Sequence, residues 1–375
     1  MAKTLSLFAL ILFFLSGCGQ VETPEKKKII VWLELREQQR EIIKEAQSLF
    51  SKKHPEADIS VEIVPFQAEK DLLLKGEVSK PDIFMGINDW LSELISREII
   101  ADFPSDSRNQ DFYPQTVDSL YQEGKLWALP YSFEYLAMFY YKDITPPKNL
   151  TDLEKLRQTP ENPVVAYDMY NFYYHFPFLT DFFDGKFGLP MLFSPQMEQS
   201  ISSIRRLVET GIMPPDCSYD QARNLFSSKK ASIFITGPWD IESFKDQNIG
   251  IAPIFSFTDR KSRPFLGIKC FYISKNSRNQ DLSREFLYTM LSEKFQQRLL
   301  KLRVPPANKK VVIGDDPFLK FYFENLPFTY PLPGGPEMAT VWSAGKALLY
   351  LTLHDKQEFA QATEKISHEI DQNSP

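Results

Sequence analysis

Short apolar runs alternate with amphipathic segments from residue 29 onward, which leaves few architectures open to this chain. Ile29 to Leu33 and the alternating stretch Ala57 to Val64 are typical of strands, whereas Glu37 to Lys53 repeats apolar residues at helical spacing. A third strand is predicted over Pro81 to Gly86, and a helix follows over Asp89 to Ser96. This β-α-β-α-β order predicts an α/β fold with a mostly parallel sheet, in which ligands bind beyond the carboxyl ends of the strands. Asp89 lies at such an end.

The rest of the chain continues to mix helices and strands without an internal repeat. Helices are predicted over Phe178 to Gly185, Met197 to Thr210 and Leu282 to Leu302, and again from Glu337 onward. Strands are predicted over Ala231 to Ile235, Ile249 to Phe255 and Ile268 to Ser274. Leu326 to Pro336 contains four of the 27 prolines, so we expect a rigid, exposed loop there. A length of 375 residues favours two domains, or one large one, over a small module.

The N-terminus has the features of a secretory signal. Lys3 is followed by an apolar run from Leu5 to Leu15, which is too short for a permanent membrane helix of about 20 residues. The run ends in Leu15-Ser16-Gly17-Cys18, which resembles a bacterial lipobox, in which the cysteine becomes the new N-terminus and its sulfur carries diacylglycerol. The alternative is an ordinary cleaved signal with a cysteine there by chance. We therefore predict a signal peptide over residues 1–17, lipidation of Cys18, and a polar tether over residues 18–28.

Charge and cysteine content exclude several classes of protein. The chain has 43 Lys and Arg against 49 Asp and Glu, a net charge of -6 without a long basic run, so no nucleic-acid partner is expected. Three cysteines without a C-x-x-C pair indicate neither a disulfide framework nor a zinc site. Cys217 and Cys270 could pair if their Cα atoms were close, but we favour Cys270 as a small buried apolar residue.

Sequence motifs of catalysis are missing. The chain contains no G-x-x-x-x-G-K-[ST], G-x-G-x-x-G, G-x-S-x-G or H-E-x-x-H, and its four histidines are scattered. We therefore expect a protein that is not an enzyme and that needs no cofactor or metal.

Several segments, in order, resemble the extracellular solute-binding proteins of ATP-binding-cassette sugar importers, above all those that bind maltose and maltodextrins. The segments are Lys80 to Phe84 with Asn88-Asp89, Gly124 to Pro130, Phe133 to Leu136, Tyr141 to Asp143, Phe226 to Ala231, Ile235 to Trp239, Arg263 to Gly267, and Met338 to Lys346. They extend over almost the whole chain after the tether. Any one of them is weak evidence, and the ordered set together with the lipobox is strong.

The resemblance implies a type II periplasmic-binding-protein-like fold of two α/β domains, each a mostly parallel sheet flanked by helices. The N-terminal lobe would contain residues 29–131 and 267–314, and the C-terminal lobe residues 132–266 and 315–375, with crossing strands as a hinge. The ligand would lie in the cleft between the lobes, whose closure is read by permease subunits in the membrane. The expected protein is a monomer, lipid-anchored to the bacterial cell membrane outside the cytoplasm.

A sugar offers hydroxyls at its edge and C–H groups on its faces, so its site needs carboxylates and aromatic rings. Trp239, in the Gly-Pro-Trp turn, and Trp342 are the predicted stacking residues, although either could be a core tryptophan. Asp89 could accept hydrogen bonds from hydroxyls or cap the helix that it begins. Glu134, in an apolar run, needs a partner, which could be a ligand hydroxyl or a buried cation.

The resemblance adds Tyr173 and Tyr174 as aromatic ligand contacts and marks positions where this chain departs from the family. Trp90 replaces a basic residue and could stack on a sugar or form a packed wall. Lys346 stands where an arginine is expected, and Asn171 replaces an acidic residue. Trp90 and Lys346 are also predicted to contact the ligand, which makes eight predicted ligand contacts in all. The polar, glycine-containing ligand loop after the first strand is replaced by residues 34–37.

The function predicted from these residues is binding of an oligosaccharide such as a maltodextrin for import. The same fold could instead bind another sugar, a sugar phosphate, a polyamine or a metal complex. A secreted glycosidase using Asp89 and Glu134 is an alternative, which needs those carboxyl groups about 5–5.5 Å or about 6.5–9.5 Å apart. An adhesin or scaffold whose own side chains fill the cleft is a third possibility.

Overall fold

The computed structural model describes residues 26–34, 37–75, 81–156 and 162–373, and these form a mixed α/β protein with two principal sheets. Cys18 and the predicted signal peptide lie outside these residues. No helix in the described ranges is long and apolar enough to cross a membrane. Cys217 and Cys270 are both buried free thiols, in line with the apolar role favoured for Cys270.

The first sheet has seven strands, ordered β13-β12-β3-β1-β2, with β4 and β7 also paired to β12. β1 pairs in parallel with β2 and β3, as the opening alternation predicts, whereas β12 runs antiparallel to β3, β4 and β7. The strands are β1 (Lys27–Leu33), β2 (Ala57–Ile63), β3 (Ile83–Ile87), β4 (Ile100–Ala101), β7 (Leu129–Glu134), β12 (Phe265–Ser274) and β13 (Tyr330–Pro331).

The second sheet has four strands in the order β11-β8-β10-β9, and only the pairing between β10 and β9 is parallel. The expectation of a mostly parallel sheet in each domain therefore does not hold for this sheet, because β8 runs antiparallel to both of its neighbours. Its strands are β8 (Ala137–Tyr141), β9 (Val165–Ala166), β10 (Ile233–Thr236) and β11 (Ile249–Ala252). A short hairpin of β5 (Tyr121–Gln122) and β6 (Lys125–Leu126) completes the strands of the described chain.

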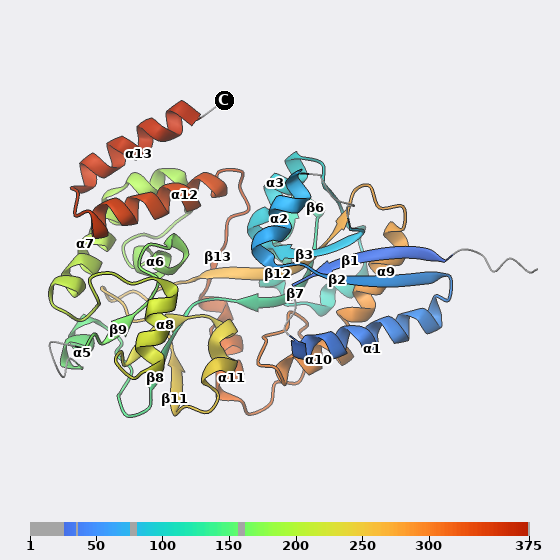
Figure 1. Ribbon diagram of the computed structural model, residues 1–375, viewed down its shortest axis with the longest axis horizontal. Helices are drawn as coiled ribbons and strands as arrows, with labels where there is room; N and C mark the ends of the chain where they lie inside the picture. The colour runs from blue at the N-terminus through green and yellow to red at the C-terminus, as the bar shows by residue number, and fades with distance from the viewer. Residues whose placement is uncertain (1–25, 35–36, 76–80, 157–161, 374–375) are drawn as a thin grey trace, which may run out of the picture.

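Helices cover both sheets (Figure 1). Those beside the first sheet are α1 (Glu37–Lys53), α2 (Phe66–Lys75), α3 (Leu91–Ser96), α4 (Pro114–Asp118), α9 (Gln280–Met290) and α10 (Glu293–Leu300). Those in the other half are α5 (Leu150–Lys155), α6 (Phe172–Leu179), α7 (Pro195–Glu209), α8 (Tyr219–Ser227), α11 (Pro317–Asn325), α12 (Met338–Leu349) and α13 (Phe359–Asn373).

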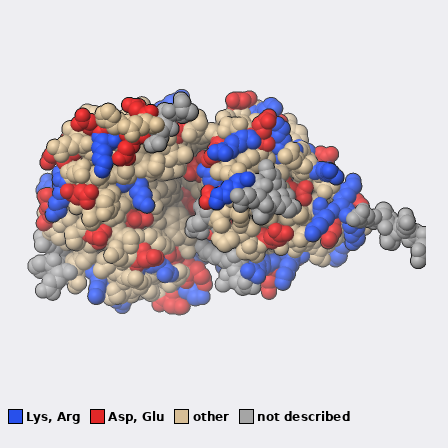
Figure 2. Space-filling view, turned by 45° about the horizontal axis from the view of Figure 1, so that its top comes forward, with Lys and Arg blue, Asp and Glu red and all other residues tan. Residues whose placement is uncertain are grey.

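Two strands of the first sheet connect the two halves. β7 is followed after two residues by β8 of the second sheet, and β12 follows β11. In Figure 1 both β7 and β12 run between the group of β1, β2 and β3 and the group of α6, α8 and α12. Figure 2 shows that the surface is hollowed into a furrow between the two halves, with charges of both signs scattered over this face.

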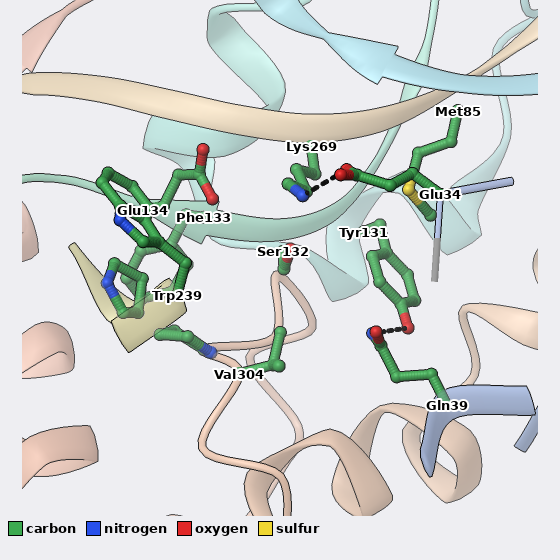
Figure 3. A pocket seen from close by; sticks show the side chains of 12 residues that line it. Glu34, Gln39, Met85, Tyr131, Ser132, Phe133, Glu134, Trp239, Lys269 and Val304 are labelled. Carbon is green, nitrogen blue, oxygen red and sulfur yellow. Dashed lines mark hydrogen bonds and ion pairs between the residues drawn. The ribbon is translucent and has the colours of Figure 1, made fainter. Parts of the chain in front are cut away.

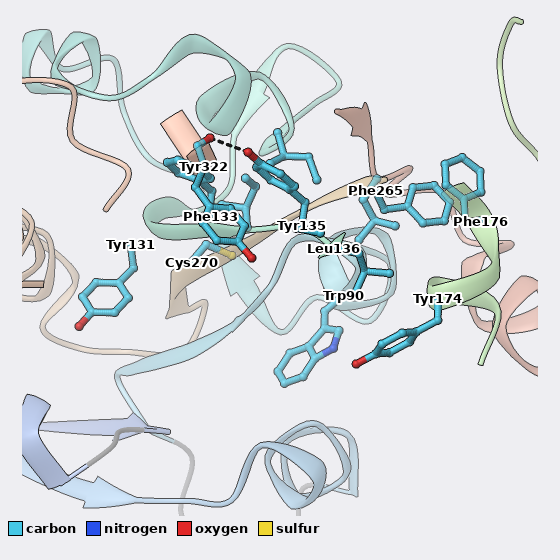
Figure 4. Packing of buried hydrophobic residues seen from close by; sticks show 14 of the residues in the cluster. Trp90, Tyr131, Phe133, Tyr135, Leu136, Tyr174, Phe176, Phe265, Cys270 and Tyr322 are labelled. Carbon is cyan, nitrogen blue, oxygen red and sulfur yellow. Dashed lines mark hydrogen bonds between the residues drawn. The ribbon is translucent and has the colours of Figure 1, made fainter. Parts of the chain in front are cut away.

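One hydrophobic core runs without interruption through both halves, because aromatic residues pack on the connecting strands (Figure 4). Phe265 of β12 stacks on Phe176 of α6 with ring centroids 3.4 Å apart. Tyr135, just after β7, is buried and donates a hydrogen bond to the Tyr322 carbonyl oxygen at 2.7 Å. The connecting strands are therefore held on both sides by large rings.

Most predicted elements are confirmed, and three predictions are wrong in position or extent. The helix expected over Phe178 to Gly185 is α6, six residues earlier, and it begins where the Asn171 side chain accepts a hydrogen bond from the Tyr173 backbone N–H at 3.1 Å. The single helix expected over Leu282 to Leu302 is divided between α9 and α10. The loop at 326–336 is not fully exposed, because Leu326 and Leu332 are buried and it contains β13.

Candidate functional site

The connecting strands place three polar side chains on one face of the first sheet. Gly267 of β12 is opposite Glu134 of β7, and Lys269 is opposite Ser132. Residues two apart in a strand point to the same side, so Ser132, Glu134 and Lys269 share a face. They line a cavity of about 260 Å³, here called the strand cavity, together with Trp239 and residues after β1.

Polar pairs extend along this strand cavity (Figure 3). Lys269 Nζ lies 2.9 Å from Glu34 Oε2, and Gln39 donates to the Tyr131 hydroxyl at 3.0 Å. In Figure 3, Glu134 and Trp239 lie at the end of the cavity opposite to Gln39 and Tyr131. The cavity thus combines an aromatic ring, carboxylates and an ammonium, a set that can hydrogen-bond hydroxyls and stack on an apolar face.

Trp239 takes its place because of the glycine two residues before it. A Cβ at Gly237 would lie only 2.2 Å from the Trp239 ring, so the ring folds back over the glycine backbone. Asp240, which is buried, accepts hydrogen bonds from the Tyr219 and Thr236 hydroxyls, both at 2.6 Å. Arg223 Nε donates to the other oxygen of Asp240 at 3.1 Å. This network holds the turn that carries Trp239.

A second cavity, of about 710 Å³, lies against α12 and is here called the helix cavity. Its lining residues come from the end of β3, from the start of α6 and from α12, and they include Asp89, Trp90, Tyr173, Trp342 and Lys346. The Trp342 indole N–H donates to Asp89 Oδ2 at 3.0 Å, a hydrogen bond that joins α12 to the 3-10 turn after β3. Five of the eight predicted ligand contacts therefore line one cavity.

Two of the predicted ligand contacts beside this cavity each have a polar atom that lacks a partner. Asp89 Oδ1 and the Tyr173 hydroxyl are out of solvent and have no hydrogen-bond partner among the described residues. Burial raises the pKa of Asp89 to about 6, against the lowering effects of Lys70 and of the Trp342 hydrogen bond. Burial, with the nearby Glu134 and Asp89 carboxylates, holds the pKa of Tyr173 well above its usual value. Buried polar groups without partners are costly, so both atoms are suited to a hydroxyl-bearing ligand.

The two cavities are neighbours across Gly267. A Cβ at this position would lie 3.2 Å from Glu134 Cγ, in the strand cavity, and 3.4 Å from Ile87 Cδ1, in the helix cavity. The two carboxylates near Tyr173 are those of Glu134 and Asp89, and each belongs to a different cavity. A side chain at Gly267 would therefore press on residues of both cavities.

The other predicted ligand contacts lie in or behind the two cavities. Glu134 and Trp239 line the strand cavity. Trp90 is 5% exposed, and its ring packs over Gly86 as a wall of the helix cavity. Tyr174 is buried and lines neither cavity; its ring contacts those of Tyr173 and Tyr219. The structure thus brings seven of the eight residues to the two cavities and places Tyr174 behind them.

Sequence reasoning missed several lining residues. Lys269 interrupts the apolar run of β12, and a charged residue in such a run is a signal for an inward polar role. Glu34 directly follows β1, where a parallel sheet places its ligand contacts, but its pairing with Lys269 joins positions 235 residues apart. Asp168, Tyr170 and Tyr350 line the helix cavity without any local sequence signal.

The described ranges contain no cluster of His, Cys, Asp or Glu that could hold a metal ion. Comparison with protein families gives a match over residues 49–320 to the bacterial extracellular solute-binding proteins. The chain belongs to this family. The α/β architecture and the resemblance described above are thereby confirmed.

Curated relatives of this solute-binding protein are named for sugars. The maltotriose-binding protein of Pyrococcus abyssi is 26% identical over 88% of this chain and 78% of its own length. The galactooligosaccharide-binding protein of Bacillus subtilis is 24% identical over 97% of this chain and 96% of its own. The maltooligosaccharide ABC transporter solute-binding lipoprotein of Streptococcus pneumoniae is 26% identical over 72% and 71%, respectively. These relatives are named as binding components and not as enzymes.

Proposed function

We propose that this protein is the extracytoplasmic substrate-binding subunit of an ATP-binding-cassette importer and binds an oligosaccharide of the maltodextrin type. The observation that carries the proposal is the pair of adjoining cavities, in which Trp239 and Trp342 provide rings while Glu134 and Asp89 provide carboxylates. A sugar needs both kinds of surface, and the unpartnered Asp89 Oδ1 and Tyr173 hydroxyl can each bind a sugar hydroxyl.

In this proposal the cavities lie between two lobes, residues 29–131 with 267–314 and residues 132–266 with 315–375. β7 and β12 are the hinge, and closure on the sugar forms the surface that the permease recognises. The protein acts as a monomer tethered by a lipidated Cys18. The pneumococcal relative named as a lipoprotein supports this anchor.

A thermal-shift screen of the purified protein tests the ligand. A ligand present at about a hundred times its dissociation constant stabilises the fold by about 2.7 kcal/mol, so we expect the unfolding midpoint to rise by several degrees with maltotriose or longer maltodextrins. Galactooligosaccharides, sugar phosphates and polyamines are the comparison ligands. If the unfolding midpoint rises with galactooligosaccharides alone, these and not maltodextrins are the ligand. If it rises with no sugar, the proposal is refuted.

Sugar affinity is expected to depend on pH through Asp89. Its raised pKa of about 6 means that the carboxyl group is mainly protonated at pH 5 and mainly ionised at pH 7. Because the ionised form accepts hydroxyl hydrogen bonds better, affinity should rise about tenfold from pH 5 to pH 7. The stability that Asp89 contributes to the protein without sugar has the opposite dependence, being present at low pH and lost as the pH rises through about 6.

Isothermal titration calorimetry at both pH values measures this effect, with Asp89→Asn as the matched control. The amide does not titrate, so the variant should bind the sugar with an affinity that is the same at pH 5 and pH 7. An equally steep pH dependence in Asp89→Asn would show that another group is responsible. Asp168, whose pKa is raised by burial in the same cavity, would then be the next group to replace.

A further inference from the structure

One row of side chains on α12 continues past the predicted ligand contacts. Trp342, Lys346 and Tyr350 follow one another at intervals of four residues, and all three line the helix cavity. This spacing places them on one side of a helix, and eight residues at helical rise extend roughly 12 Å. The helix cavity therefore continues along α12 well beyond the ring of Trp342.

The helix changes its geometry where this row ends. Tyr350 begins a π-helical turn, Tyr350–His354, which directly follows α12. Such turns are rare in proteins overall, and those that occur are often found at functional sites. Within this turn Leu351 and Leu353 are buried, whereas Tyr350 is 43% exposed, so the large aromatic side chain is the one directed toward the cavity and solvent.

Tyr350 is exposed but held in position. Its ring stacks on His354 with centroids 4.4 Å apart and an interplanar angle of 15°, and the Tyr170 ring meets it edge-on at 5.4 Å. One face of the ring is covered by His354, and the exposed surface remains for another partner. A braced ring with an open surface provides a stacking platform at little cost in side-chain entropy.

Polar groups stand beside this platform. Asp168 lines the same cavity and accepts a hydrogen bond from the Asn171 amide at 3.3 Å, and its charge interacts with Lys346. A carboxylate and an ammonium near one aromatic ring can accept from and donate to ring hydroxyls. The combination repeats the chemistry of the cavity around Asp89 and Trp342 at a second position.

We infer that Tyr350, Tyr170, Asp168 and Lys346 form an additional subsite, which takes a further pyranose ring of an oligosaccharide longer than one that fills the positions beside Trp239 and Trp342. The inference rests on the proposed function. All four residues belong to the second proposed lobe, so this subsite needs no closure to form. The protein should therefore prefer long oligosaccharides over short ones.

Calorimetric titration of maltose, maltotriose, maltotetraose and maltoheptaose into the purified protein tests the subsite. In Tyr350→Ala, the affinity advantage of the longest over the shortest sugar bound is expected to fall by about three- to tenfold, the range for loss of one aromatic contact. Tyr350→Phe keeps the ring and should restore the advantage. Tyr121→Ala removes a similarly exposed tyrosine, 47% exposed on β5, and is the control for altered folding.

The results separate the two proposals. If the wild-type protein binds these sugars and Tyr350→Ala keeps the full advantage for long ones, the subsite is refuted and the proposed function stands. An equal loss of advantage in Tyr121→Ala would also refute it. If the wild-type protein binds none of the four sugars, the maltodextrin proposal fails and the subsite fails with it.

Discussion

The double replacement Trp239→Ala and Trp342→Ala is expected to weaken oligosaccharide binding by at least about a hundredfold, since central aromatic contacts are each worth about 2 kcal/mol or more. One tryptophan lies in each cavity, so the variant removes a stacking surface from both positions at once. It also removes the hydrogen bond from Trp342 to Asp89. Calorimetry measures the affinity, and small-angle X-ray scattering with and without sugar measures the closure that should be lost.

Trp127→Ala is the matched control for the double variant. Trp127 is half-buried, donates to the Gln122 carbonyl oxygen at 3.0 Å and lines neither cavity, so its loss should leave sugar affinity unchanged. Undiminished closure in the double variant would refute the site. An equal loss of sugar affinity in Trp127→Ala would show that destabilised folding, and not the loss of stacking surfaces, weakens binding in the double variant.

Asp240→Ala is expected to lower the free energy of unfolding by about 3 kcal/mol, since removal of a buried acceptor leaves its donors without partners. The hydroxyls of Tyr219 and Thr236 would lose the oxygen to which both donate at 2.6 Å. Because Arg223 is partly exposed, water can replace its contact, and most of the loss comes from the two hydroxyls. Urea unfolding measures the change in stability.

The same variant should also disturb the ring next to it. Trp239 directly precedes Asp240 in the turn, so the Trp239 side chain should become more mobile. We expect its fluorescence to report this mobility and sugar affinity to fall. Asp220→Ala, an exposed aspartate in the first turn of α8, is the control and should cost less than about 0.5 kcal/mol. A cost equally small in Asp240→Ala would show that the network does not hold the turn.

The strands and amphipathic helices were predictable because their patterns are local. α1 has the predicted bounds, and β1 and β2 agree with the prediction to within two residues. α6 was misplaced because the aromatic stretch from Tyr167 to Phe183 has no polar and apolar alternation to show a helical face. Its start depended on one capping side chain, Asn171, whose signal is weak beside so many rings.

The residues of the site could be named from the resemblance, but their grouping could not. The Asp89–Trp342 hydrogen bond joins positions 253 residues apart, and only the folded chain shows that Glu134 and Trp239 line a different cavity. Tyr173 and Tyr174 are adjacent at the start of α6, but the first lines the cavity and the second is buried behind it. The sequence alone did not distinguish them. The role of these residues as ligand contacts stays a prediction for the variants above.

The hydrogen bond between Trp342 and Asp89 affects how quickly a bound sugar would dissociate from the proposed site. Oδ2 already accepts the indole N–H, whereas Oδ1 has no partner among the described residues, so in the proposed site a sugar hydroxyl that replaces the indole N–H at Oδ2 gains only the difference between two similar hydrogen bonds. Small net gains shorten residence time far more than they slow capture, because differences in affinity between related complexes lie mostly in the dissociation rate. In the proposed importer subunit, the Trp342 N–H would favour release of the sugar, because it can re-form its hydrogen bond with Asp89 as soon as the sugar hydroxyl leaves.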